Sequence, residues 1–109
     1  MAESKTQRVP THPGEILRLD VLPAMKVTQE RFGEMLGLSR QTVNHILAGR
    51  SPVSAETAVK LGALFGNSPQ FWLNMQSAYD LWVAEGQMQD KVLKDLAVLQ
   101  RQYAALARR

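Results

Sequence analysis

Residues 38–50, which read LSRQTVNHILAGR, carry several side chains that can pair with the edge of a DNA base. In the major groove, arginine can bind guanine through two hydrogen bonds, and glutamine or asparagine can bind adenine in the same way. The candidates for such base contacts are Arg40, Gln41, Thr42, Asn44 and His45. The same residue types are common on the solvated face of an ordinary helix, so the elements around them must decide between the two interpretations.

The spacing of the apolar residues in this stretch predicts a short helix with two different faces. One face carries Val43, Ile46 and Leu47. At about 100° per residue, Gln41 and His45 lie opposite that apolar face. Ser39 is a typical N-cap, and Gly49 is a typical stop. We therefore expect the polar residues to point away from the body of the protein.

A second short helix is predicted directly before this one, within residues 28–37. Thr28 is a typical N-cap, and Gly37 is a typical helix end because glycine readily adopts the left-handed conformation found there. Its apolar stripe consists of Phe32, Met35 and Leu36. Only a few residues join the two helices, which predicts a sharp and packed corner.

The two helices and their corner resemble the DNA-binding helix-turn-helix. In that comparison Gly33 is the small residue where the helices cross, Gly37 makes the turn and Leu38 fills it. The resemblance implies that the amino-terminal part of the second helix reaches the bases. Helix amino termini also bind phosphate through backbone N–H groups. The expected phosphate contacts are Thr28, Gln29, Ser39, Arg50 and Ser51.

The remaining sequence predicts three more helices and a helical tail. In the first helix, Pro13 occupies the first helical position and Pro23 ends the helix. Ser54 and Ser68 are N-caps of the other two helices. No segment shows the two-residue alternation of a half-buried strand. The chain is therefore predicted to be all-α.

The predicted organisation is one small domain with an extension at each end. We expect a flexible amino-terminal arm at residues 1–11, a helix-turn-helix domain at residues 12–84 and a C-terminal helical extension at residues 85–109. A length of 109 residues, 45% of them hydrophobic, suits a single small core. Such a core is only marginally stable alone, so we also expect oligomerisation.

Composition argues against several other classes of protein. The chain has no cysteine, its two histidines (His12 and His45) lie on different elements, and no glycine-rich phosphate loop is present. We therefore expect no enzyme activity, no metal and no cofactor. No apolar run is long enough to span a membrane, and the lack of cysteine suits the cytoplasm. With a net charge of only +3, DNA binding would depend on geometry rather than on bulk charge.

Two sequence motifs and the five-helix spacing between them resemble the HigA antitoxin family. The motifs are HPGEILR and TAVKLGALFGNSPQFWLNMQ. The likeness covers about residues 12–83. It implies a five-helix Cro/repressor-like helix-turn-helix domain, here with an additional C-terminal helix. It also implies a cytoplasmic homodimer that represses its own operon on a palindromic operator in double-stranded DNA. The family further implies a RelE/HigB-like, mRNA-cleaving toxin protein that the antitoxin holds inactive.

Two alternatives stay open at this point. One is a stand-alone helix-turn-helix transcriptional regulator without a toxin partner. The other is a protein-interaction module that has lost DNA binding. The polar residues Arg40, Gln41 and Asn44 argue against the second alternative.

Aromatic and apolar residues in the second half of the chain are candidates for a dimer or partner interface. The tail shows a seam with a spacing of 4, 3, 4 and 3 residues from Val92 to Leu106. Two or so heptads make only a marginal helix in water, which indicates that some surface covers it. The tail can pair with its copy, pack back on the domain or bind the toxin. The candidate interface residues are Trp72, Met75, Tyr79, Trp82, Leu96, Leu99 and Tyr103.

Overall fold

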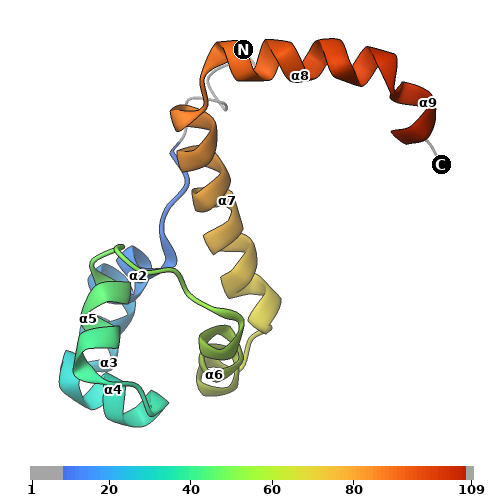
Figure 1. Cartoon of the computed structure of the whole chain (residues 1–109). Helices are drawn as coiled ribbons and strands as arrows, with labels where there is room; N and C mark the ends of the chain where they lie inside the picture. Colours follow the sequence, from blue (N-terminus) through green and yellow to red (C-terminus); the bar gives the residue numbers. More distant parts are fainter. Residues whose placement is uncertain (1–8, 108–109) are drawn as a thin grey trace, which may run out of the picture.

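The computed structural model describes residues 9–107, which form helices joined by short turns (Figure 1). The helical elements are α2 (Pro13–Ile16), η1 (Leu17–Val21), α3 (Leu22–Met25), α4 (Gln29–Leu36), α5 (Arg40–Leu47), α6 (Ala55–Phe65), α7 (Pro69–Gln87), α8 (Asp90–Gln102) and α9 (Ala104–Ala107). The described part of the chain contains no strand, so the all-α prediction is confirmed. Most of the expected flexible arm, residues 1–8, lies outside the described residues.

The first three elements form one continuous helical segment, and the prediction that Pro23 ends it is wrong. The backbone N–H of Leu22 bonds to the carbonyl of Leu17, five residues earlier, which is the wider turn of a π-helix. Pro23 follows directly after this wider turn, and the helix continues through it as α3. The segment ends only at Lys26, which adopts the left-handed conformation with φ of 60°.

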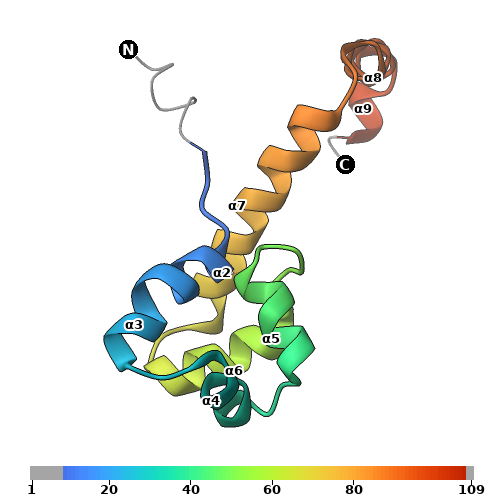
Figure 2. The same ribbon diagram turned by 90° about the vertical axis from the view of Figure 1, so that its left-hand side faces the viewer.

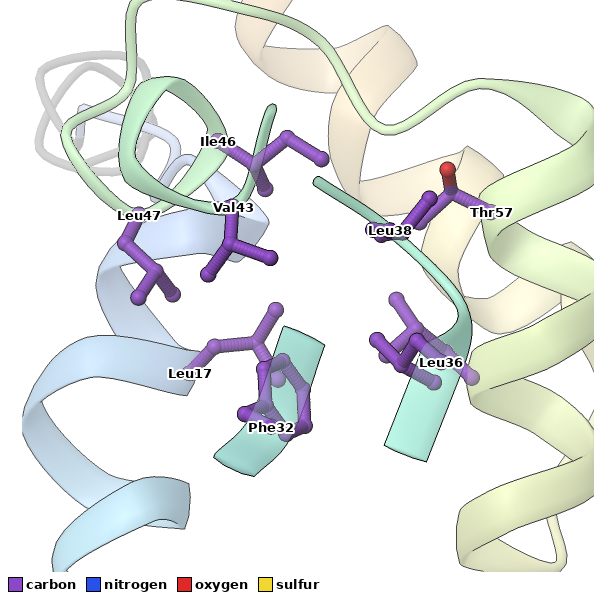
Figure 3. Close-up of a pocket in the computed structure, with 9 residues that line it drawn as sticks. Leu17, Phe32, Leu36, Leu38, Val43, Ile46, Leu47 and Thr57 are labelled. Carbon is purple, nitrogen blue, oxygen red and sulfur yellow. The ribbon is translucent and has the colours of Figure 1, made fainter. Parts of the chain in front are cut away.

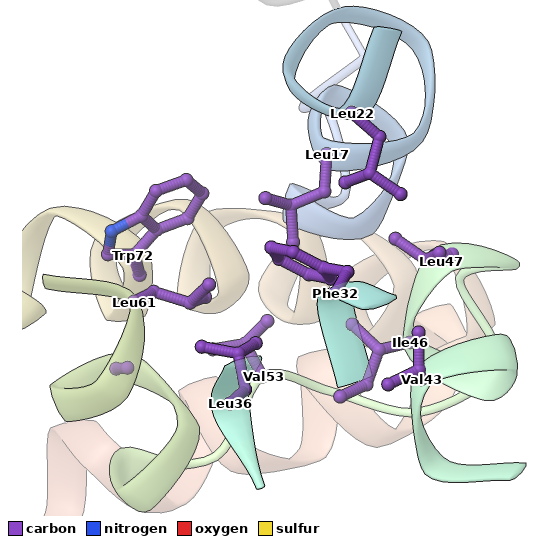
Figure 4. Packing of buried hydrophobic residues seen from close by; sticks show 11 residues of the cluster. Leu17, Leu22, Phe32, Leu36, Val43, Ile46, Leu47, Val53, Leu61 and Trp72 are labelled. Atoms are coloured by element: carbon purple, nitrogen blue, oxygen red, sulfur yellow. The ribbon is translucent and has the colours of Figure 1, made fainter. Parts of the chain in front are cut away.

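The hydrophobic core lies between α2–α3, α4, α5, α6 and the first half of α7 (Figure 4). Phe32 of α4 lies in its middle, and Trp72 of α7 covers one side beside Leu61. All the helices of the expected five-helix domain contribute to it. The buried core residues are Leu17, Leu22, Phe32, Leu36, Val43, Ile46, Leu47, Val53, Ala58, Leu61 and Trp72.

The second half of α7 leaves the core and carries α8 with it. Figures 1 and 2 show α8 at the far end of α7, away from α4, α5 and α6. The helix α7 runs through the expected domain boundary at residue 84 and ends at Gln87, where Met88 and Gln89 turn the chain in extended conformation. Tyr103 interrupts the tail between α8 and α9. No residue of α8 is buried.

A buried hydrogen bond attaches α7 to the loop that follows α5. The side-chain oxygen Oε1 of Gln76 accepts a hydrogen bond of 2.8 Å from the backbone N–H of Val53. The Nε2 group of Gln76 donates to the carboxylate of Asp80 at 2.9 Å. Because Gln76 and the N–H of Val53 are buried, this N–H depends on the side chain of Gln76 for its acceptor.

We predict that Gln76→Leu lowers the free energy of unfolding by about 1–3 kcal/mol, because the buried N–H of Val53 loses its acceptor. Urea unfolding followed by circular dichroism measures this loss. Gln70→Leu is the matched control, because Gln70 makes its side-chain bond to Asn74 on the exposed face of the same helix. The control should change stability by less than about 0.5 kcal/mol. Equal losses in both variants would contradict the assigned role of the buried bond.

Candidate nucleic-acid interface

The helices α4 and α5 begin at their predicted caps and α4 ends at Gly37 as predicted, whereas α5 ends at Leu47, two residues before the expected stop at Gly49. Thr28 caps α4 by accepting a 3.0 Å hydrogen bond from the backbone N–H of Arg31. Ser39 caps α5 in the same way, with a 3.1 Å bond from the backbone N–H of Thr42. Between the helices, Gly37 has φ of 69°, the left-handed conformation expected of the turn residue. The two caps and the glycine fix where each short helix starts and stops.

The corner is packed closely enough to require the small residue that the sequence places there. A Cβ atom on Gly33 would lie 3.1 Å from both the carbonyl oxygen of Leu38 and the Cγ2 atom of Val43. These are tighter than ordinary van der Waals contacts. Alanine at this position would need the neighbouring atoms to shift by a few tenths of an ångström. The close approach sets the crossing of α5 over α4.

The inner face of α5 is anchored in the core (Figure 3). Val43, Ile46 and Leu47 are each no more than 5% exposed. Figure 3 shows the side chains of Val43 and Leu47 directed toward Leu17 and Phe32, and that of Ile46 directed toward Leu38. The helix therefore cannot turn about its axis without exposing apolar surface.

The outer face of α5 presents most of the predicted base-reading residues to solvent. Four of the five are exposed, and His45 is half-buried. The hydroxyl of Thr42 also accepts a 2.8 Å hydrogen bond from the hydroxyl of Ser39, within the cap. This leaves Gln41 and Asn44 as exposed amide side chains on successive turns. The exposed four are Arg40, Gln41, Thr42 and Asn44.

An ion pair that the sequence analysis missed joins the starts of α4 and α5. The Nη2 atom of Arg40 lies 3.2 Å from the Oε2 atom of Glu30, and the two side chains are 71% and 65% exposed. Ten residues separate them in the chain, and only the crossing of the helices brings them together. An exposed pair of this kind contributes at most about 1 kcal/mol, so a DNA phosphate or base can compete with the carboxylate.

The predicted phosphate contacts fall at both ends of α5. Thr28, Gln29 and Ser39 are exposed at the starts of α4 and α5. Arg50, which is exposed, and Ser51, which is half-buried, follow the last turn of α5. The backbone N–H groups of Arg50 and Ser51 both donate to the carbonyl of His45, at 2.9 and 3.2 Å. This turn is therefore held in place by the helix itself.

The predicted interface residues separate into buried and exposed groups. Trp72 is 3% exposed, and its indole N–H donates to the side chain of Asn67 at 2.9 Å, so it packs inside its own chain. Met75 and Tyr79 are half-buried, whereas Trp82 is 44% exposed on the free half of α7. The exposed members on the tail are Leu96, Leu99 and Tyr103.

Neither a metal-binding cluster nor a membrane-spanning helix occurs in residues 9–107. Within this range, no three histidine, aspartate or glutamate side chains gather closely enough to hold a metal ion. None of the described helices is both long and apolar enough to cross a membrane.

Comparison with known proteins places the chain among DNA-binding regulators. Residues 20–72 match the helix-turn-helix family model. Antitoxin HigA-1 of Vibrio cholerae is 39% identical over 102 residues, which cover 92% of this chain and 96% of the relative.

Two solved structures extend the likeness to three dimensions. An antidote protein of the HigA family from Coxiella burnetii superposes with a TM-score of 0.73 at 36% identity, covering 80% of this chain and 95% of that one. Antitoxin HigA of Pseudomonas aeruginosa, solved with the higBA promoter, gives 0.66 at 36% identity, covering 74% and 97%. The chain therefore belongs to the HigA-type antitoxin family of DNA-binding helix-turn-helix proteins.

Proposed function

We propose that this protein is a homodimeric, cytoplasmic antitoxin that represses its own operon by binding a palindromic operator, and that it neutralises a RelE/HigB-like toxin. The observation that carries the proposal is the fixed orientation of α5. Its apolar face is buried in the core, and its polar face is exposed at the start of the helix. The relative from P. aeruginosa was solved with promoter DNA, which supports the same use of this fold here.

In this proposal α5 lies in the major groove and reads bases from its first two turns. Arg40, Gln41 and Asn44 are the principal readers, because their side chains are exposed and carry the donors and acceptors that base edges match. Thr42 and His45 contribute at the margin of the contact, since the first is engaged in the cap and the second is half-buried.

Phosphate contacts bracket this reading helix in the proposal. Thr28, Gln29 and Ser39 lie at helix starts, where free N–H groups and the positive end of the helix dipole attract anions. Arg50 and Ser51 lie at the other end of α5. Such contacts fix the register of the protein on DNA but carry no sequence information.

The homodimer is proposed to use the free half of α7 and the tail. Trp82 of α7 is exposed, as are Leu96, Leu99 and Tyr103 of the tail, although all four are large and apolar or aromatic. Large apolar side chains exposed in such number are typical of an interaction site. A two-fold dimer would place two reading helices about 34–36 Å apart, which is one turn of DNA, and so predicts a palindromic operator.

We predict that Gln41→Ala and Asn44→Ala each weaken binding to the DNA upstream of the protein's own gene by about 1–3 kcal/mol, with little effect on a shuffled duplex. Arg50→Ala should weaken binding to both duplexes alike. It should also reduce the slope of log affinity against log salt concentration by about one, the value for one lost phosphate contact. Fluorescence anisotropy at two salt concentrations measures both effects. Equal losses from all three variants on both duplexes would show that the roles are misassigned. If the unmodified protein binds both duplexes weakly and equally, the DNA part of the proposal fails.

We predict that Glu30→Gln strengthens binding to the upstream duplex by up to about fivefold, because it frees Arg40 from an exposed ion pair. Glu34→Gln on the same helix is the matched control, since it removes the same charge from an exposed pair with Arg31. The control should have the smaller effect in the same anisotropy titration. An equal gain from both variants would assign the effect to net charge rather than to the pair.

We predict that the double variant Leu96→Glu/Leu99→Glu converts the dimer to a monomer of 12.2 kDa in sedimentation equilibrium, because it places charges in the proposed interface. Lys94→Glu, on the other side of α8, is the control and should remain a dimer. A double variant that stays dimeric would remove this surface from the dimer. Expression of the product of the adjoining gene, alone and together with this protein, tests the toxin part of the proposal. Growth arrest by that product alone, relieved by co-expression, is expected; no arrest by the product alone would make the protein a stand-alone regulator.

A further inference from the structure

The motif HPGEILR, residues 12–18, has no role in the proposed base or phosphate contacts. In the structure it lies against the last turn of α5. A Cβ atom on Gly14 would overlap the backbone carbonyl oxygen of Ile46. The backbones of α2 and α5 therefore touch at this point, and glycine is the residue that allows it. Rotation or withdrawal of the end of α5 would break this contact.

Arg18, four residues later, binds the same end of α5. Its Nε atom donates a 3.2 Å hydrogen bond to the backbone carbonyl of Leu47, which lies 29 residues away in the chain. The last carbonyls of a helix lack partners within the helix, and a positive charge there is favourable. Arg18 thus satisfies a free carbonyl and ties it to the first helical segment.

His12 extends this contact to the turn after α5 and to α7. The ring is 5% exposed, and its Nδ1 atom accepts a 2.9 Å hydrogen bond from the backbone N–H of Gly14. Its ring meets that of Tyr79 edge-on, with centroids 5.0 Å apart. Burial lowers the pKa of His12, although a hydrogen bond with the Ser51 backbone and the nearby carboxylates of Asp80 and Glu15 act in the opposite direction. The ring is therefore mainly neutral at pH 7, as its role as an acceptor requires.

We propose that His12, Gly14 and Arg18 form a clamp that sets the orientation of α5 and of the Arg50–Ser51 turn, and so determines sequence selectivity without touching DNA. The inference rests on the proposed function of sequence-selective DNA binding. The corner with α4 holds only the amino-terminal end of α5, and the clamp holds the other end. Recognition of a base by two hydrogen bonds from one side chain depends on this orientation, whereas attraction to phosphate does not.

The decisive variant is Arg18→Met, which keeps the length of the side chain and removes the donor. We expect it to lower the ratio of affinities for the upstream duplex and a shuffled duplex by about three- to tenfold, the range that the loss of one hydrogen bond gives. Arg18→Lys retains a donor and should recover much of the ratio. Arg101→Met, on the exposed tail, is the matched control for the lost charge. It should weaken binding to both duplexes alike and leave the ratio of affinities unchanged.

A second variant tests the backbone contact. Gly14→Ala should lower the ratio further than Arg18→Met, because the new Cβ pushes α2 away from Ile46. If Gly14→Ala does not fold, the Arg18 variants still decide the question.

Hydrogen exchange of the protein without DNA separates the clamp from a direct DNA contact. The backbone N–H groups of residues 48–51 bond to carbonyls of the last turns of α5, so they report on its end. We expect faster exchange at these amides in Arg18→Met, but not in Arg18→Lys or Arg101→Met. Lost selectivity with unchanged exchange would overturn the clamp, because Arg18 would then act on DNA directly. Unchanged selectivity in Arg18→Met would overturn it as well.

The two proposals fail in different ways. If the unmodified protein does not distinguish the two duplexes, the proposed function fails. The clamp is then judged by exchange alone: faster exchange in Arg18→Met supports it, and unchanged exchange overturns it.

Discussion

Burial of the inner face of α5 is the interaction on which the rest of the structure depends. Val43, Ile46 and Leu47 are almost completely withdrawn from water. Each such side chain contributes about 1.5–3 kcal/mol relative to an exposed one. A helix of eight residues is not stable alone in water. This packing therefore stabilises the helical conformation of α5 and also fixes its position. Because one face is held inside, the opposite polar face has a fixed direction.

Three separate sets of contacts hold α5 and the loop that follows it. The Ser39 cap and the close crossing at Gly33 hold its start, and the first helical segment holds its end. The loop that follows is bonded to α7 through the buried side chain of Gln76. A surface that reads DNA needs such rigidity, because hydrogen bonds to base edges tolerate little displacement.

The helix α7 joins two parts of the molecule with different environments. Its first half covers the core with Trp72, and its second half carries exposed Trp82 and leads to α8, which has no buried residue. The helix α7 therefore separates α8 from the loop that follows α5 (Figure 1). The same helix supplies both Gln76 to that loop and the base of the proposed dimer surface.

The sequence by itself determined the all-α class, the caps and the inner and outer faces of α5, because these depend on neighbours a few residues apart. It did not determine the continuation of the first helix past Pro23, since that depends on a π turn several residues earlier. It also placed Trp72 among interface candidates, although the packing buries it. The Glu30–Arg40 pair and the contact of Gly14 with Ile46 were decided only by tertiary structure. Both join residues on different helices. The local pattern that predicts the corner between α4 and α5 specifies neither which side chains meet across it nor that α2 packs on α5.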